Sequence, residues 1–254
     1  MAGAVPALGV QDLGFAVGGA VIVDGVSFDV GAGELVTIIG PNGAGKTSLF
    51  NLVSGLYAPT AGRVLLLGRD VTGEAPFRRA QLGLGRTFQT SSVFPALTLL
   101  ENVRLGVQAR AGGSLRPWRL AGRDRDSVDA AREALEAVGL ARLAGLPAAL
   151  LAHGDKRKLE VAILLGGRFE VLLLDEPTAG VAVEDVPELM RLIASLREAG
   201  KTVLMVEHRM DLVIGLSDRI AVMHQGRLLT IAEPARVMED PVVQEAYLGM
   251  GAKT

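Results

Sequence analysis

The glycine-rich segment that begins at Gly40 has the residue types of a phosphate site. Small residues allow successive backbone N–H groups to surround a phosphate, and the start of a following helix adds the positive end of its dipole. In such a loop the Lys46 ammonium would reach the β- and γ-phosphates of a nucleotide, and the Thr47 hydroxyl would hold Mg²⁺. A glycine turn that binds nothing is the alternative. The sequence favours a nucleotide site made by Gly40, Pro41, Asn42, Gly43, Ala44, Gly45, Lys46, Thr47 and Ser48.

Two acidic residues, Asp175 and Glu176, follow the apolar run 171–174. A phosphate loop needs a carboxylate on a second strand, and Asp175 would bind Mg²⁺ there through water. Glu176 stands one residue further, where it could polarise the water that attacks the γ-phosphate. Taken alone, the pair could equally be two solvated acids at the end of a strand. Together with the phosphate loop, it predicts a hydrolytic site.

Two kinds of apolar pattern predict two kinds of strand to position these residues. Strands buried on both faces of a parallel sheet read as short continuous apolar runs. Runs of this kind span residues 35–39, 171–174 and 203–206. Partly alternating runs bounded by glycines instead suggest an antiparallel edge layer, and these span residues 10–17, 20–30 and 64–67. We therefore expect an α/β protein whose central sheet is mostly parallel.

Helical patterns dominate between residues 97 and 165 and predict a separate helical subdomain. Within it, Ser127 is expected to cap a helix in which apolar residues recur at helical spacing up to Val138. The segment 106–122 is rich in glycine and carries arginines, so it is expected to be a solvated loop.

The composition excludes several classes of protein. The 254 residues include no cysteine, which rules out disulfides, thiolate metal sites and cysteine nucleophiles. The 26 Lys and Arg residues nearly balance 28 Asp and Glu residues, so the overall charge gives no reason to expect nucleic acid as a partner. The longest uncharged stretch, 47–62, is too short to cross a bilayer, which needs about 20 mostly apolar residues. No basic segment of a secretory signal precedes Asp12, so we expect a cytoplasmic protein that is soluble when isolated.

Four further elements give the chain a resemblance to the ATP-binding subunits of ABC transporters. Residues 85–89 (Gly-Arg-Thr-Phe-Gln) are similar to the segment whose glutamine senses Mg²⁺ and the membrane subunit. Residues 151–156 (Leu-Ala-His-Gly-Asp-Lys) lie where the family has its signature loop. Residues 177–182 follow the two acids as the family's D-loop does, and His208 ends a strand as its switch histidine does. The resemblance runs from about residue 10 to residue 249.

Two other classes of phosphate-loop protein fit less well. A GTPase should contain an Asn-Lys-x-Asp segment that reads guanine, and this chain has none. A kinase would leave the signature-like residues 151–156 and His208 without a role.

The resemblance implies one ABC nucleotide-binding domain that extends over residues 1–254. Its fold would be that of an ABC-type P-loop NTPase, an α/β fold with a central, mostly parallel sheet, an N-terminal antiparallel β subdomain and an inserted helical subdomain. We expect residues 8–88 and 168–250 to form the ATP-binding core with its antiparallel layer, and residues 89–167 to form the helical signature subdomain.

The resemblance also implies roles for single residues, with ATP and Mg²⁺ as cofactors. Glu176, His208 and Gln89 are the expected catalytic residues. Thr47, Gln89 and Asp175 are the expected metal ligands.

The signature and base-binding positions depart from the family pattern. In the family, the signature loop opens a helix that faces the γ-phosphate bound by a partner subunit. Here Ala152 replaces its serine, His153 a glycine and Asp155 its glutamine, whereas Gly154 is kept. Backbone donors and the helix dipole survive such changes, so all four residues are still expected to bind nucleotide. The family has an aromatic residue that stacks on adenine, but the corresponding position of this chain is Val17. The base is therefore expected to pack on Val17 or on Phe15 in the same strand.

Details of these segments resemble the subunits that serve uptake of branched-chain amino acids and related hydrophobic amino acids or amides. The matching stretches are residues 88–90 with 94–95, 99–103, 112–125, 151–154 and 245–249. In such importers two ATP-binding subunits, identical or not, dock beneath two membrane permeases at the cytoplasmic face of the inner membrane. A periplasmic or extracellular substrate-binding protein feeds the permeases.

Two alternatives remain within the family. An exporter ATPase, for lipids for example, should have a signature nearer to Leu-Ser-Gly-Gly. An ABC ATPase that acts as a scaffold or regulator without transport usually carries two ATPase domains, whereas this chain has one phosphate loop.

Overall fold

The computed structural model describes residues 5–87, 93–111 and 120–248. Its strands are β1 (Leu8–Val17), β2 (Ala20–Val30), β3 (Leu35–Ile39), β4 (Ala61–Leu66), β5 (Arg69–Asp70), β6 (Leu84–Arg86), β7 (Val171–Asp175), β8 (Thr202–Val206), β9 (Arg219–His224) and β10 (Arg227–Ala232). Its α-helices are α1 (Lys46–Ser54), α2 (Pro76–Gln81), α3 (Leu99–Ala111), α4 (Leu120–Ala137), α5 (His153–Gly166), α6 (Val186–Glu198), α7 (Met210–Leu216), α8 (Pro234–Glu239) and α9 (Pro241–Leu248). Short 3-10 turns span Ala141–Leu143 and Ala148–Leu150.

A six-stranded sheet forms the centre of the molecule, in the order β10-β9-β3-β8-β7-β6. All neighbouring strands are parallel except β10, which runs antiparallel to β9. Every residue of β3, β7 and β8 is buried, as expected for their continuous apolar runs. The predicted mostly parallel sheet is therefore confirmed. Because parallel strands end at the same edge of a sheet, the segments after Ile39, Asp175 and Val206 lie next to one another.

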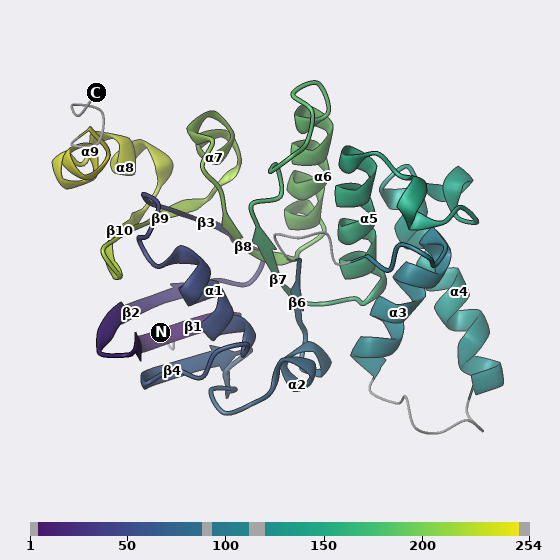
Figure 1. Cartoon of the computed structure of the whole chain (residues 1–254), viewed down its shortest axis with the longest axis horizontal. Coiled ribbons are helices and arrows are strands. Elements are labelled where there is room, and N and C mark those ends of the chain that lie inside the picture. The colour runs from purple at the N-terminus through teal and green to yellow at the C-terminus, as the bar shows by residue number, and fades with distance from the viewer. Residues whose placement is uncertain (1–4, 88–92, 112–119, 249–254) are drawn as a thin grey trace.

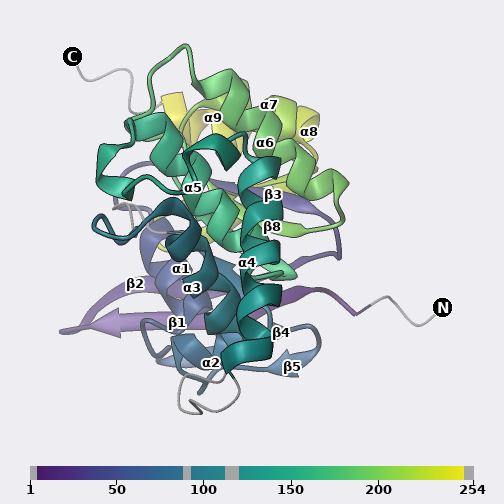
Figure 2. The ribbon, with the colours of Figure 1, turned by 90° about the vertical axis from the view of Figure 1, so that its right-hand side faces the viewer.

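A four-stranded antiparallel sheet, in the order β2-β1-β4-β5, confirms the predicted edge layer. Figure 2 shows α1 between this sheet and the central one. The apolar face of α1, which includes Leu49, Phe50, Leu52 and Val53, packs in one core with residues from both sheets. The helix that follows the phosphate loop is thus held from two sides.

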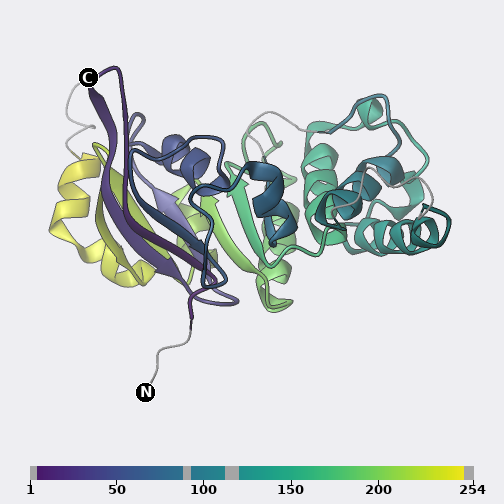
Figure 3. The same cartoon turned by 90° about the horizontal axis from the view of Figure 1, so that it is seen from below.

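The helices α3, α4 and α5 pack together in a lobe at one end of the molecule (Figures 1 and 3). A second core joins this lobe to α6 and to the other face of the central sheet, through residues such as Leu172, Leu174 and Val203. Among the described helices, none is both long and apolar enough to span a membrane.

Two expectations for the helical lobe are wrong. Ser127 does not cap a helix, because α4 begins at Leu120 and Ser127 lies inside it. Its buried hydroxyl instead accepts a hydrogen bond from Arg104 Nε of α3, at 3.3 Å. The segment 106–122 is not a loop throughout, because Gly106 lies within α3. A Cβ atom at Gly106 would be 2.7 Å from the carbonyl oxygen of Ile163, so this glycine serves close packing of α3 on α5.

A buried arginine fixes the far end of α1. Arg79 of α2 is 1% exposed, and its Nη1 donates to the carbonyl oxygens of Leu52 and Val53 at 2.8 and 2.7 Å. It also donates to the carbonyl oxygens of Thr72 and Glu74. Burial lowers the pKa of Arg79 to about 10, so the side chain stays charged and complements the negative end of the helix dipole. Arg79 thereby anchors the helix that begins at the phosphate loop.

Candidate functional site

The phosphate loop connects the buried strand β3 to α1, in the order that the sequence predicts. A Cβ atom at Gly40 would lie 2.2 Å from the carbonyl oxygen of Met223, and one at Gly45 would lie 2.7 Å from that of Ile22. Both glycines also have positive φ angles, 154° and 95°, so only glycine fits these two positions. At the start of α1, Lys46 is buried, whereas Thr47 is exposed.

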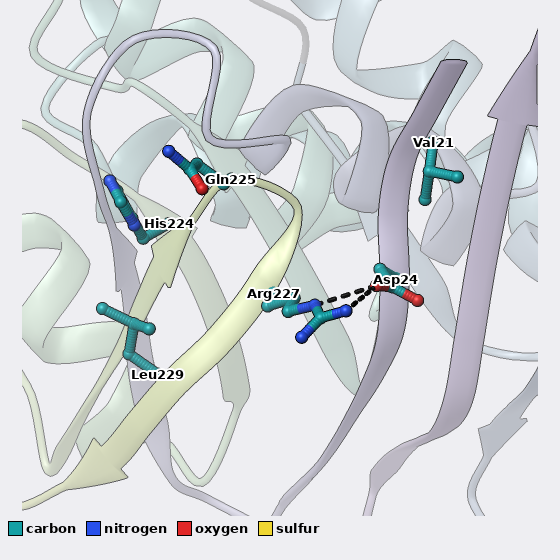
Figure 4. Close-up of a pocket in the computed structure, with 6 residues that line it drawn as sticks. All are labelled: Val21, Asp24, His224, Gln225, Arg227 and Leu229. Atoms are coloured by element: carbon teal, nitrogen blue, oxygen red, sulfur yellow. Dashed lines mark hydrogen bonds and ion pairs between the residues drawn. The ribbon is translucent and has the colours of Figure 1, made fainter. Parts of the chain in front are cut away.

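The turn between β9 and β10 ties this loop to β2. Gly226 N donates to the carbonyl oxygen of Ala44 at 3.1 Å, and Asp24 N donates to the carbonyl oxygen of Gly226 at 2.9 Å. Figure 4 shows the residues that line a cavity beside this turn, including the ion pair in which Arg227 Nε donates to Asp24 Oδ2 at 2.8 Å. The volume of the cavity is about 380 Å³. The cavity is lined by Val21, Asp24, His224, Gln225, Arg227 and Leu229. The ion pair joins the two sheets close to the phosphate loop.

The Lys46 ammonium folds back over the loop. Its Nζ donates to the carbonyl oxygens of Gly40 and Pro41, at 2.6 and 3.0 Å. Burial lowers the pKa of Lys46, and the nearby Glu176 and Asp175 carboxylates oppose this change. The cation is therefore placed inside the loop and close to both acids.

Asp175, at the end of β7, is buried and has two unlike carboxylate oxygens. Oδ2 accepts a hydrogen bond from Arg86 Nη2 at 3.1 Å, whereas Oδ1 has no hydrogen-bond partner among the described residues. Burial raises the pKa of Asp175, and the charge and hydrogen bond of Arg86 oppose that rise. A buried acceptor without a donor is costly. Oδ1 therefore fits a ligand for a hydrated Mg²⁺ ion, which prefers carboxylate oxygens and keeps several waters.

Glu176 and His208 are in direct contact. His208 Nε2 lies 2.7 Å from Glu176 Oε1, and both side chains are partly exposed to solvent. Glu176 adopts the left-handed backbone conformation, with φ of 48°, and its N–H donates to the carbonyl oxygen of Val206. This conformation costs a residue other than glycine about 1–3 kcal/mol and is concentrated at functional sites. The strand ends thus hold a carboxylate against an imidazole beside the phosphate loop.

Sequence reasoning missed Glu207, which fixes two loops of the site. Its side chain is 2% exposed. Oε1 accepts hydrogen bonds from the N–H and hydroxyl of Thr178, at 2.9 and 2.7 Å, and Oε2 accepts one from His208 N at 3.0 Å. The one sequence feature that could have indicated Glu207 is its position as an acid directly after the apolar run 203–206. Glu207 connects the D-loop to the segment that carries His208.

The signature residues lie at the N-terminus of α5. Ala152 and His153 are exposed, Gly154 is buried and Asp155 is partly buried. The helix packs on α3, α4 and α6, and Figure 1 shows β7 and β8 between α5 and α1. Within the described part of a single chain, the signature is therefore not brought to the phosphate loop.

The two expected base-binding positions, Val17 and Phe15, have different surroundings. Val17 is 55% exposed at the end of β1, which leaves it accessible to a ligand. The Phe15 ring is instead stacked on Tyr57, with centroids 5.2 Å apart and planes at 17°. A register shift between Phe15 and Ala16 interrupts the alternation of side chains along this strand. Gln89 lies outside the described residues.

Three comparisons identify the family of this chain. The ABC transporter family pattern matches residues 23–179. The high-affinity branched-chain amino acid transport ATP-binding protein LivG of Salmonella typhimurium is 39% identical over 250 residues, which cover 96% of this chain and 98% of LivG. The lipopolysaccharide export system ATP-binding protein LptB of Acidithiobacillus ferridurans is 35% identical over 229 residues, 90% of this chain and 91% of LptB.

A solved structure is similar over nearly the whole fold. The nucleotide-free ATP-binding cassette from an ABC transporter superposes with a TM-score of 0.83 at 30% identity, over 96% of this chain and 99% of that one. The likeness therefore includes both the central sheet and the helical lobe. This chain belongs to the ABC transporter family, as an ATP-binding subunit that hydrolyses ATP.

Proposed function

We propose that this chain drives an ABC importer for branched-chain amino acids or related hydrophobic amino acids or amides. The observation that carries this substrate class is the 39% identity to LivG over 96% of the chain. The Leu-Ala-His-Gly form of the signature, at the exposed start of α5, supports the same assignment.

The phosphate loop is proposed to hold ATP together with Mg²⁺. Lys46 would exchange the carbonyl oxygens of Gly40 and Pro41 for phosphate oxygens, because an ammonium binds an anion more strongly than a neutral acceptor. Thr47, with its exposed position at the start of α1, and Asp175 Oδ1 are the proposed metal ligands, with Gln89 as a third. When bound, Mg²⁺ would supply positive charge to the phosphate oxygens during hydrolysis.

Glu176 is the proposed general base. Its carboxylate would accept a proton from the attacking water, and His208 holds that carboxylate through the 2.7 Å contact between Nε2 and Oε1. His208 would also contact the γ-phosphate. The orientation of the Glu176 carboxylate would then depend on whether the γ-phosphate is present.

A second ATP-binding subunit, identical or different, is proposed to complete the site. Ala152 and His153 are exposed at the start of α5, where the first N–H groups of a helix lack intrahelical partners and can bind anions. Since they lie away from the phosphate loop of their own chain, the proposed anion is the γ-phosphate bound by the partner. Val17 is the proposed contact for the base.

The helical lobe is proposed to contact two membrane permeases. Residues 95–99 lie beside residues 146–149, joined by backbone hydrogen bonds. On this surface Phe94, Leu146 and Leu150 are 56%, 42% and 70% exposed, which suits an apolar partner. The complex would lie at the cytoplasmic face of the membrane, with a periplasmic or extracellular substrate-binding protein acting on the permeases and no role for nucleic acid.

The two parts of the chain would then have different tasks. Residues 8–88 and 168–250 carry the nucleotide, and residues 89–167 carry the signature and the permease surface. Motion between them is the proposed link between ATP binding and transport.

Reconstitution tests this function. The chain, purified from membranes with the permeases that accompany it, is placed in vesicles with the substrate-binding protein. We expect uptake of labelled leucine that requires ATP and is lost in the Lys46→Ala variant. The absence of amino acid uptake, together with ATP hydrolysis stimulated by lipopolysaccharide or another lipid, would support the exporter function suggested by the 35% identity to LptB.

A further inference from the structure

The guanidinium of Arg86 lies between the phosphate-loop helix and the metal-binding acid. Arg86 ends β6, and its side chain is 9% exposed. Nη1 donates to Asn51 Oδ1 at 2.8 Å and to Ser54 Oγ at 2.6 Å, both on α1. Nη2 donates to Asp175 Oδ2 at 3.1 Å. A single buried cation therefore joins three elements of the site.

The two carboxylate oxygens of Asp175 have different surroundings. Arg86 occupies Oδ2, so Oδ1 is the oxygen left for another ligand. The Asp175 side chain is 1% exposed, and its ion pair with Arg86 limits the rotation of the carboxylate. The planar guanidinium of an arginine holds a carboxylate and acceptors on another element in one fixed geometry, whereas a lysine offers a single point charge on a flexible stem.

The residue after Arg86 holds the backbone of the same acid. Asp175 N donates to Thr87 Oγ1 at 3.3 Å, and Thr87 N donates to the carbonyl oxygen of Leu173 at 2.9 Å. Both ends of Asp175 are therefore held by the end of β6. This strand end leads directly into the segment that contains Gln89.

We infer that Arg86 is a positioning residue for the metal: it fixes Asp175 so that Oδ1 faces Mg²⁺, and it keeps this acid in register with α1, which carries Thr47. The inference rests on the proposed Mg²⁺ site. Residues that orient a metal ligand through a hydrogen bond commonly contribute 10–100-fold to metal affinity.

The test measures how much Mg²⁺ strengthens ADP binding. The ADP dissociation constant of the full chain is measured by calorimetry with EDTA and with Mg²⁺. The EDTA value divided by the Mg²⁺ value reports how much the metal strengthens binding. In Arg86→Lys, which keeps the charge but loses the fork, we expect this ratio to fall about tenfold, with the EDTA value unchanged. Ser54→Ala, which removes one acceptor of Arg86 together with the 3.2 Å bond from Ser54 Oγ to the carbonyl oxygen of Asn51, should lower the ratio by a smaller factor.

Two further variants distinguish a failure of the proposed metal site from a failure of the inference about Arg86. Arg219→Lys is the matched control, because Arg219 Nη2 pairs with Glu34 Oε2 at 2.8 Å at the other end of the central sheet, and its ratio should equal that of the wild type. Asp175→Asn should remove most of the metal contribution. If Asp175→Asn has no effect, the proposed metal site is wrong. If Asp175→Asn lowers the ratio but Arg86→Lys and Ser54→Ala do not, Arg86 is only structural and the inference fails.

Discussion

Replacing Glu176 with glutamine is expected to lower the rate of ATP hydrolysis by about 10²–10⁴-fold, the usual contribution of a general base. The amide has nearly the same shape and can still contact His208, which lies 2.7 Å from the carboxylate, but it cannot accept the proton of the attacking water. ATP affinity should therefore change little. Phosphate release by the assembled transporter at saturating ATP measures the rate.

The control for this variant is Glu239→Gln. Glu239 is exposed on α8, so the same chemical change there should leave hydrolysis at the wild-type rate. A Glu176→Gln transporter that hydrolyses ATP at the wild-type rate would show that another group removes the proton.

Replacing Lys46 with alanine is expected to weaken ATP binding by about 10–150-fold, since a hydrogen bond to a charged group contributes about 1.5–3 kcal/mol. The buried ammonium is already directed into the loop, where it binds the carbonyl oxygens of Gly40 and Pro41, so its loss removes the cation nearest to the proposed phosphates. Equilibrium binding of ATP to the purified chain measures the effect.

Lys201→Ala is the matched control for the lysine variant. Lys201 directly precedes β8, at the end of the parallel sheet opposite to the phosphate loop, so this change should not alter ATP affinity. Equal ATP affinities for Lys46→Ala and the wild type would mean that the loop does not hold the phosphates as proposed.

The sequence predicts much of the framework of this site because the signals are local. The runs 35–39, 171–174 and 203–206 are apolar throughout, and all three become buried parallel strands. Once these strands share one sheet, their ends must meet at one edge, which places the phosphate loop, Asp175, Glu176 and His208 together. The positions of these residues directly after the apolar runs were therefore enough to predict that they lie together.

What the sequence does not predict depends on contacts between distant residues. Arg86 meets Asp175 across 89 positions and Glu207 meets Thr178 across 29, and no local pattern distinguishes these charges from solvated ones. Ser127 has a cap-like sequence context but lies inside α4, where it contacts Arg104 of α3. Phe15 shares a strand with Val17, yet it stacks on Tyr57.

The most direct test of the central claim is a crystal structure of the Glu176→Gln chain with ATP and Mg²⁺. The account predicts that the triphosphate lies in the loop from Gly40 to Thr47, with Lys46 Nζ moved from the loop carbonyls to the phosphate oxygens. Asp175 Oδ1 should face the metal, and His208 should remain beside residue 176. A triphosphate bound outside this loop, or a metal ion away from Asp175, would contradict the account.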